Sequence, residues 1–179
     1  STQDAGMRKT WYYAFGLASL LCVLTSLAWF SMRSPLRVVL GGESREAYLT
    51  RQLDYYDDYA LINPTTPSDA RIWLINMRRD TYNLERTAIS DYLFEDWTLR
   101  KFVWQAKDID DLRANARQLG ADYILARHDF LFDYDRSTLV DDRKPRVENA
   151  AKLQLAREFL LDPASEVKAD NRFSLIKLD

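Results

Sequence analysis

A run of twenty residues without a single charge, Trp11 to Phe30, constrains this chain more than any other feature of its sequence. As an α-helix with a rise of about 1.5 Å per residue, a segment of this length spans the hydrocarbon core of a bilayer, which is about 30 Å thick. Aromatic residues stand at both ends of the run, where amphipathic rings favour the headgroup layer. No later segment of the sequence repeats the pattern. We therefore predict one membrane span followed by a water-soluble domain.

A cleavable signal peptide is the main alternative to a retained span. The apolar region of a signal peptide is shorter, about 7–15 residues, and ends in small residues at a cleavage site. Here the apolar run continues into Trp29, Phe30 and Met32, which form a poor cleavage context. We therefore favour a transmembrane helix over residues 11–32.

One face of the predicted span carries small residues at four-residue intervals, namely Ala14, Ala18, Cys22 and Ser26. Small residues let helix backbones approach closely, and lipid gives apolar helices no hydrophobic reason to associate otherwise. We interpret this stripe as a candidate packing surface for another membrane helix, although small residues are also common in spans generally. Cys22 is the only cysteine, which excludes an intrachain disulfide and a zinc site of the cysteine type.

Charge separates the two parts of the chain. Residues 1–37 contain four basic residues and one acidic residue, whereas the remaining 21 basic and 26 acidic residues give a net charge of −5. An acidic domain without a basic stripe lacks the electrostatic footprint of a nucleic-acid-binding protein. We therefore expect no nucleic-acid partner. About 140 soluble residues are enough to bury the core of one domain.

Helical and strand patterns alternate through the soluble part. Ser44 and Asp108 are candidate N-caps, and Gly120 is a helix stop. The expected helices cover 44–62, 108–119 and 147–161, the expected strands cover 71–77, 88–89, 121–126 and 172–178, and the bulky segment 91–104 shows only loose periodicity. Such alternation predicts one α/β sandwich with a mostly parallel sheet. The predicted organisation is a short tail over 1–10, the transmembrane helix 11–32, a linker over 33–43 and an extracytoplasmic domain over 44–179.

The residues that could form a catalytic, metal-binding or phosphate-binding site match the known patterns only weakly. His128 is the only histidine, and without a cysteine or a second histidine it makes a poor metal site or triad. Asp133-Tyr134-Asp135 matches the D-x-D pair of some sugar-nucleotide transferases, but chance matches are expected in an acidic chain. The isolated glycines form no phosphate-binding loop. We expect no catalytic residue, no cofactor and no metal site in this chain.

Aromatic residues give a better indication of function than the polar ones do. Tyr and Trp are enriched where proteins contact one another, although packing in the core explains many single rings. The candidate contact residues are Tyr55, Tyr59, Trp97, Trp104, Phe130 and Phe132.

Several segments, in order, resemble one family over roughly residues 20–179. Ser44-Arg-Glu-Ala-Tyr-Leu49, then Tyr59 and Ile62-Asn63, and the Pro67-led strand into Leu74 are similar to the soluble tail of GT-C type glycosyltransferases that use polyprenyl-phosphate sugars. The segment from Leu112 to Leu125 resembles a later helix-Gly-strand element of that tail, and Asn171 to Leu178 resembles its closing strand. The resemblance implies an α/β domain on the periplasmic or lumenal side.

The departure from that family shapes the predicted function. Those enzymes bind the lipid between many membrane helices. The resemblance implies a catalytic carboxylate on an acidic residue in an outward loop upstream of the tail, and this chain does not contain that loop. The resemblance therefore transfers no catalytic role to any residue here. We expect a non-catalytic, single-span accessory or structural subunit whose domain caps or stabilises a larger membrane complex, such as a respiratory or photosynthetic one. The alternative is the C-terminal periplasmic portion of a lipid-linked-sugar glycosyltransferase.

The expected location is the bacterial inner membrane, with the N-terminus in the cytoplasm and the soluble domain in the periplasm. This orientation rests on the resemblance, because the flanking basic residues are balanced, two on each side: Arg8, Lys9, Arg33 and Arg37. The expected partners are other integral membrane subunits and the lipid bilayer.

Overall fold

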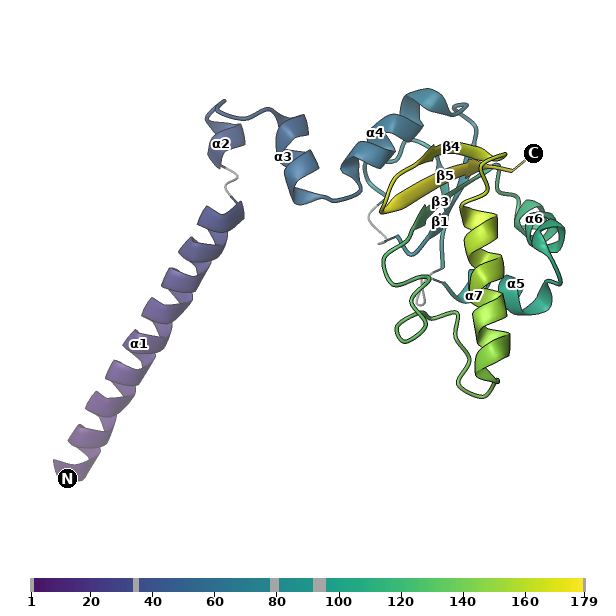
Figure 1. Cartoon of the computed structure of the whole chain (residues 1–179). Coiled ribbons are helices and arrows are strands. Elements are labelled where there is room, and N and C mark those ends of the chain that lie inside the picture. Colours follow the sequence, from purple (N-terminus) through teal and green to yellow (C-terminus); the bar gives the residue numbers. More distant parts are fainter. Residues whose placement is uncertain (1, 34–35, 78–80, 92–95, 179) are drawn as a thin grey trace. The chain divides into compact units, whose positions relative to one another are not determined.

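The chain forms two compact units, Ser1–Tyr56 and Asp57–Asp179, in a computed structural model that describes residues 2–33, 36–77, 81–91 and 96–178 (Figure 1). The helix capped by Ser44 belongs to the first unit.

The first unit begins with one long helix, α1 (Thr2–Arg33). Its segment Trp11–Met32 is the one stretch, among the residues described, that is long and apolar enough to cross a membrane, and none of it is buried. Both a retained span and a signal sequence contain such a stretch. The helix also includes residues 2–10, so the polar start and the apolar run are continuous.

Two short helices follow in the first unit. α2 (Leu36–Val39) leads into a turn in which Gly41 has a φ of 73°, a conformation that favours glycine. α3 (Arg45–Gln52) begins where expected, because the Ser44 hydroxyl accepts a hydrogen bond from the Ala47 amide at 3.1 Å. The prediction of one helix from 44 to 62 is wrong. Extended backbone at Leu53 ends α3, and α4 (Tyr56–Thr65) is a separate helix.

The second unit is built on a five-stranded sheet in the order β2-β1-β3-β5-β4. The strands are β1 (Arg71–Ile75), β2 (Thr87–Ile89), β3 (Tyr123–Arg127), β4 (Glu166–Ala169) and β5 (Phe173–Lys177). β1 pairs in parallel with β2 and β3, whereas β5 is antiparallel to both β3 and β4. The expected α/β class is therefore confirmed, with a sheet that is parallel around β1 and mixed as a whole.

Three helices cover one face of this sheet: α5 (Trp97–Gln105), α6 (Ile109–Gln118) and α7 (Arg146–Leu160) (Figure 1). Alternate strand residues, including Trp73, Ile124 and Ile176, join buried side chains of these helices in one hydrophobic cluster. α6 begins at the predicted cap, because the Asp108 carboxylate accepts from the Asp111 amide at 2.9 Å. Gly120 follows this helix with a φ of 81°.

The opposite face of the sheet is also buried. Ile72, Leu74 and Leu125 alternate with the residues of the first cluster and are almost fully inaccessible. Tyr59 and Ile62 of α4 are fully buried as well.

Candidate functional site

A cleft of about 360 Å³ lies beside α5. We call it the α5 cleft, and its lining residues are Trp97, Arg100, Lys101, Trp104, Gln105, Asp141 and Arg143. Five of these residues come from α5, at spacings of three, four and seven that place them on one side of a helix. Leu99 and Val103, on the other side of α5, are buried in the core.

The start of α5 is fixed by a side chain from the preceding segment. The Asp91 carboxylate accepts a hydrogen bond from the Thr98 amide at 2.7 Å and another from the Thr98 hydroxyl. A carboxylate at this position satisfies an amide of the first helical turn and interacts favourably with the helix dipole. Of the bulky segment 91–104, residues 92–95 lie outside the described residues, and 97–104 are helical.

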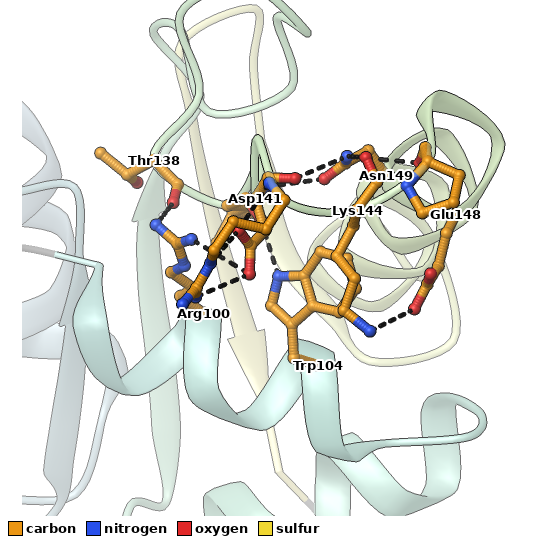
Figure 2. Close-up of polar contacts among 10 residues, drawn as sticks. Arg100, Trp104, Thr138, Asp141, Lys144, Glu148 and Asn149 are labelled. Atoms are coloured by element: carbon orange, nitrogen blue, oxygen red, sulfur yellow. Dashed lines mark hydrogen bonds and ion pairs between the residues drawn. The ribbon is translucent and has the colours of Figure 1, made fainter.

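The second wall of the cleft is the loop between Leu139 and Pro145, which α5 holds in place (Figure 2). The Trp104 indole N–H donates to the Leu139 carbonyl at 2.9 Å, and Arg100 donates to the Thr138 carbonyl at 3.0 Å. Leu139 itself is buried in the core. The Trp104 ring is therefore oriented by a polar anchor at its edge.

Asn149, near the start of α7, also holds this loop in place (Figure 2). Its side chain is buried, with 1% exposure. The amide group donates to the carbonyls of Asp141 at 3.0 Å and Lys144 at 3.1 Å, and its oxygen accepts from the Asp141 amide at 2.8 Å. One buried side chain thus satisfies several backbone groups of the cleft wall.

The electrostatics of the α5 cleft favour negative ligands. The Arg143 side chain and amide, with help from Arg100, lower the pKa of the Asp141 carboxyl to about 2. Asp141 therefore stays ionised and offsets one of the three cations that line the cleft. Lys101 is exposed, and the Arg143 side chain is 85% exposed although it binds Asp141. The cleft is locally positive in a domain that is acidic as a whole.

Lys144 lies beside Trp104 and is already engaged (Figure 2). Its ammonium group lies 5.6 Å from the centre of the Trp104 ring and pairs with Glu148 at 3.3 Å. The cation–π contact adds to the orientation of the Trp104 ring.

A second, smaller cavity of about 180 Å³ lies at the carboxyl ends of β1 and β3. α/β sheets often place sites at this edge. Here, however, most polar groups bind one another: Asn76 donates to the carbonyls of Arg127 and Asp129, and the buried Asp96 accepts from Thr138 at 2.6 Å. Burial raises the pKa of the Asp96 carboxyl. We interpret the polar contacts around this cavity as stabilising the ends of the strands.

His128 lies near this edge and pairs with a buried serine. Its Nε2 is 3.0 Å from the Ser174 hydroxyl, and its ring lies 5.7 Å from that of Phe132. Burial lowers the pKa of His128, and Ser174 is only 1% exposed. A nucleophile must be reached by its substrate, so the pair is best explained as a satisfied interior hydrogen bond.

The D-x-D segment forms a local turn. The Asp133 carboxylate accepts from the Asp135 amide at 3.0 Å, and both residues are exposed. Within the described ranges, no three side chains of His, Cys, Asp or Glu are grouped so that they could hold a metal ion. The turn is the kind that Asp forms with its own backbone.

The aromatic candidates separate into three groups. Trp97, 62% exposed, and the half-buried Trp104 come together in the α5 cleft. Phe130 is 51% exposed with the Arg136 guanidinium stacked over its ring at 3.3 Å, and Phe132 packs against the core.

Tyr55 and Tyr59, the remaining candidates, are corrections to the predicted contact surface. Tyr55 is 4% exposed and Tyr59 is fully buried. Their spacing in the sequence indicates a shared helix side but not which side faces the core, and the structure turns Tyr59 inward with Ile62. Neither ring is available to a partner.

The small stripe of α1 is exposed, as is the rest of the segment Trp11–Met32. Ala14, Ala18, Cys22 and Ser26 all lie on the uncovered helix. The Ser26 hydroxyl donates to the Cys22 carbonyl at 2.7 Å, which satisfies it within its own helix. A shallow groove of about 400 Å³ runs over Cys22, Ser26 and their larger neighbours.

Sequence reasoning named both tryptophans of the cleft and missed its polar residues. Arg100, Lys101, Asp141, Arg143 and Asn149 were not singled out. The pattern Trp-x-x-Arg-Lys-x-x-Trp over 97–104 was a usable signal, since on a helix it places cations between two aromatic rings.

Comparison of the chain with protein-family models and with curated proteins found no match. A function for it therefore rests on its own residues.

Proposed function

We propose that this protein is a membrane-anchored, non-catalytic accessory subunit that binds a partner protein through the α5 cleft. One observation carries the proposal: the cleft joins an exposed tryptophan, an oriented tryptophan and exposed cations in an otherwise acidic domain. Aromatic rings and arginine are the residues enriched at the energetic centres of protein interfaces. The partner is proposed to be an integral membrane complex.

The anchor of the proposed subunit is the segment Trp11–Met32 of α1. Its large apolar side chains are exposed, including Leu17, Leu20 and Leu24, which suits a lipid environment. The proposed orientation places the N-terminus in the cytoplasm and the α/β domain in the periplasm of a bacterial inner membrane. The small stripe would then pack on a membrane helix of the partner.

The α/β domain is proposed to be a sandwich. Support comes from the burial of both sheet faces, with α5, α6 and α7 over one and the buried side chains of α4 available for the other. Such a domain stabilises itself through its core and leaves its helical surface for binding.

A specific observation favours the alternative, the C-terminal portion of a GT-C type glycosyltransferase. Structural boundaries fall within the segments that resemble that family: Ser44 caps α3, Pro67 precedes β1, and Gly120 separates α6 from β3. Under this alternative the α5 cleft would contact the other parts of the same enzyme. A coding sequence with further spans upstream of Ser1 would favour this alternative.

The membrane location is tested by extraction and labelling. The protein should stay in the membrane pellet after extraction with alkaline carbonate, and its release would refute the membrane span. For orientation, Ala150→Cys in a Cys22→Ser background places a thiol on an exposed position of α7. We expect a membrane-impermeant maleimide to label this thiol in intact cells. Labelling only after lysis would refute the proposed orientation.

The binding surface is tested by co-purification in mild detergent. Trp97→Ala should reduce recovery of the partner, because this ring is 62% exposed and its removal leaves the core intact. Tyr82→Ala is the matched control, since Tyr82 is 86% exposed and lies outside the cleft. Equal recovery with wild type and Trp97→Ala would reject the α5 cleft as the contact surface.

A further inference from the structure

We propose that the α5 cleft takes an acidic, extended segment of its partner protein, with carboxylates at Lys101 and Arg143 and an apolar side chain between Trp97 and Trp104. This inference rests on the proposed function and adds the chemistry of the ligand. Its support is the charge balance, the ring geometry and the size of the cleft.

The lining of the α5 cleft has a net positive charge after the ion pairs among its own residues are counted. Asp141 is the one carboxylate among the lining residues, and its oxygens accept from Arg143 at 3.0 Å and lie 3.9 Å from Arg100. Lys101 is exposed, and Arg143 keeps most of its side chain in solvent. Two cationic groups thus face outward beside the rings, which suits a ligand with at least two negative charges.

The ring geometry suits an extended peptide. Trp97 and Trp104 are seven residues apart on one helix, which corresponds to about 10.5 Å along its axis. An extended chain advances about 3.3 Å per residue, so three residues cover that distance. The middle one can place an apolar side chain between the rings while its neighbours meet the cations.

The shape of the site favours a peptide over a membrane surface. The cleft is an open hollow of about 360 Å³ between α5 and the loop of Asp141, within the size range of pockets that hold small ligands. A flat headgroup layer does not enter such a hollow. A long polyanion such as nucleic acid would meet the acidic surface of the rest of the domain.

The test uses the full chain in detergent micelles and two fluorescein-labelled peptides, Glu-Glu-Phe-Glu-Glu and Gln-Gln-Phe-Gln-Gln, followed by fluorescence anisotropy. The Glu peptide should bind at least tenfold more tightly at 50 mM salt, and the difference should shrink at 500 mM, because exposed charges are screened. Lys101→Glu should weaken the Glu peptide by about fivefold, the upper range for one exposed ion pair. Trp97→Ala should weaken both peptides.

Lys107→Glu is the matched control, because it makes the same charge change on an exposed residue that does not line the cleft. Equal binding of the two peptides, or an equal effect of Lys107→Glu and Lys101→Glu, would overturn the inference. Tight binding of polygalacturonate or of phosphatidylglycerol vesicles through Lys101, without binding of the Glu peptide, would also overturn it and identify a different occupant.

The outcomes separate this inference from the proposed function. If Trp97→Ala abolishes co-purification but the Glu peptide binds no better than the Gln peptide, the contact surface stands and the acidic ligand is wrong. If the Glu peptide binds as expected but Trp97→Ala leaves co-purification unchanged, the ligand chemistry stands and the cleft does not hold the partner complex.

Discussion

Replacing Asn149 by Ala should loosen the wall of the α5 cleft and destabilise the whole α/β domain. The Asn149 side chain is 1% exposed and makes three hydrogen bonds of 2.8 to 3.1 Å with the backbone of Asp141 and Lys144. Alanine removes all three and leaves the Asp141 amide and two carbonyls to find new partners. Because the loop is part of the cleft, binding of the Glu peptide should weaken as well.

The magnitude follows from these bonds. Each hydrogen bond contributes about 1 kcal/mol net, and a buried group left unsatisfied costs somewhat more, so Asn149→Ala should lower the free energy of unfolding by about 3 kcal/mol. With a urea slope of about 2 kcal/mol/M for a domain of this size, the unfolding midpoint should fall by about 1.5 M.

The assay is urea unfolding of the full chain in detergent, monitored by circular dichroism. Gln154→Ala is the matched control, because Gln154 is exposed on the same helix and its side chain donates to that of Glu158. Its effect should stay below about 0.5 kcal/mol. A loss below about 1 kcal/mol for Asn149→Ala would refute the claim that this side chain holds the loop.

Asn149→Asp sharpens the test. The ionised carboxylate would face the carbonyl oxygens that Asn149 now donates to, so this variant should be at least as unstable as Asn149→Ala at pH 7. The introduced carboxyl would have a raised pKa in the folded state. The penalty should therefore shrink as pH falls and the carboxyl gains a proton.

Three further predictions concern other parts of the molecule. Burial lowers the pKa of His128 in the folded state, so the folded protein binds fewer protons than the unfolded chain. The free energy of unfolding should therefore fall as the pH drops below about 6.5. In His128→Gln, the free energy of unfolding measured in urea should change less between pH 7 and pH 5. Gly120→Ala should cost about 1–2 kcal/mol in urea unfolding, because φ is 81° and an added Cβ would meet the Arg71 guanidinium. Ala18→Leu should reduce co-purification of the partner while Leu21→Ala changes little, since bulk on the small stripe separates packed helices.

Each of these predictions has a contrary outcome. An unchanged pH slope in His128→Gln would mean that its burial does not contribute to acid sensitivity. A Gly120→Ala protein as stable as wild type would show that the backbone or Arg71 adjusts without cost. If Leu21→Ala releases the partner and Ala18→Leu does not, the packing face of the span has been placed on the wrong side.

Local signals predicted much of the fold. The caps at Ser44 and Asp108 are confirmed, because capping depends on a few neighbouring residues. The strands β1, β3 and β5 and the helix α7 lie within a few residues of their predicted ranges, since each has a clear apolar pattern.

Features set by distant residues were not predictable in the same way. β4 (Glu166–Ala169) was missed because it is only four residues long and mostly exposed, and its pairing with β5 is what makes it a strand. The antiparallel direction of β5 was missed as well, because strand direction depends on the path of the chain.

The candidate site shows the same division between local and distant information. The ring pair of Trp97 and Trp104 could be named from the sequence, but the cleft also needs a loop about 40 residues later in the chain. The roles of Asp141 and Asn149 come from their backbone contacts with that loop, which no spacing rule encodes. Tyr59 was misplaced for the related reason that an aromatic ring is equally suited to a core and to an interface.

The most direct test of the account is site-specific photo-crosslinking in intact cells, with p-benzoylphenylalanine at position 97 and, as a control, at position 82. Position 97 lies in the α5 cleft, and position 82 is more exposed and lies outside it. The account predicts one protein adduct from position 97, with a crosslinked peptide rich in Asp and Glu, and a much weaker adduct when Lys101→Glu is added. Equal adducts from both positions, or an adduct from position 97 that Lys101→Glu leaves unchanged and that maps to a basic or neutral segment, would contradict it.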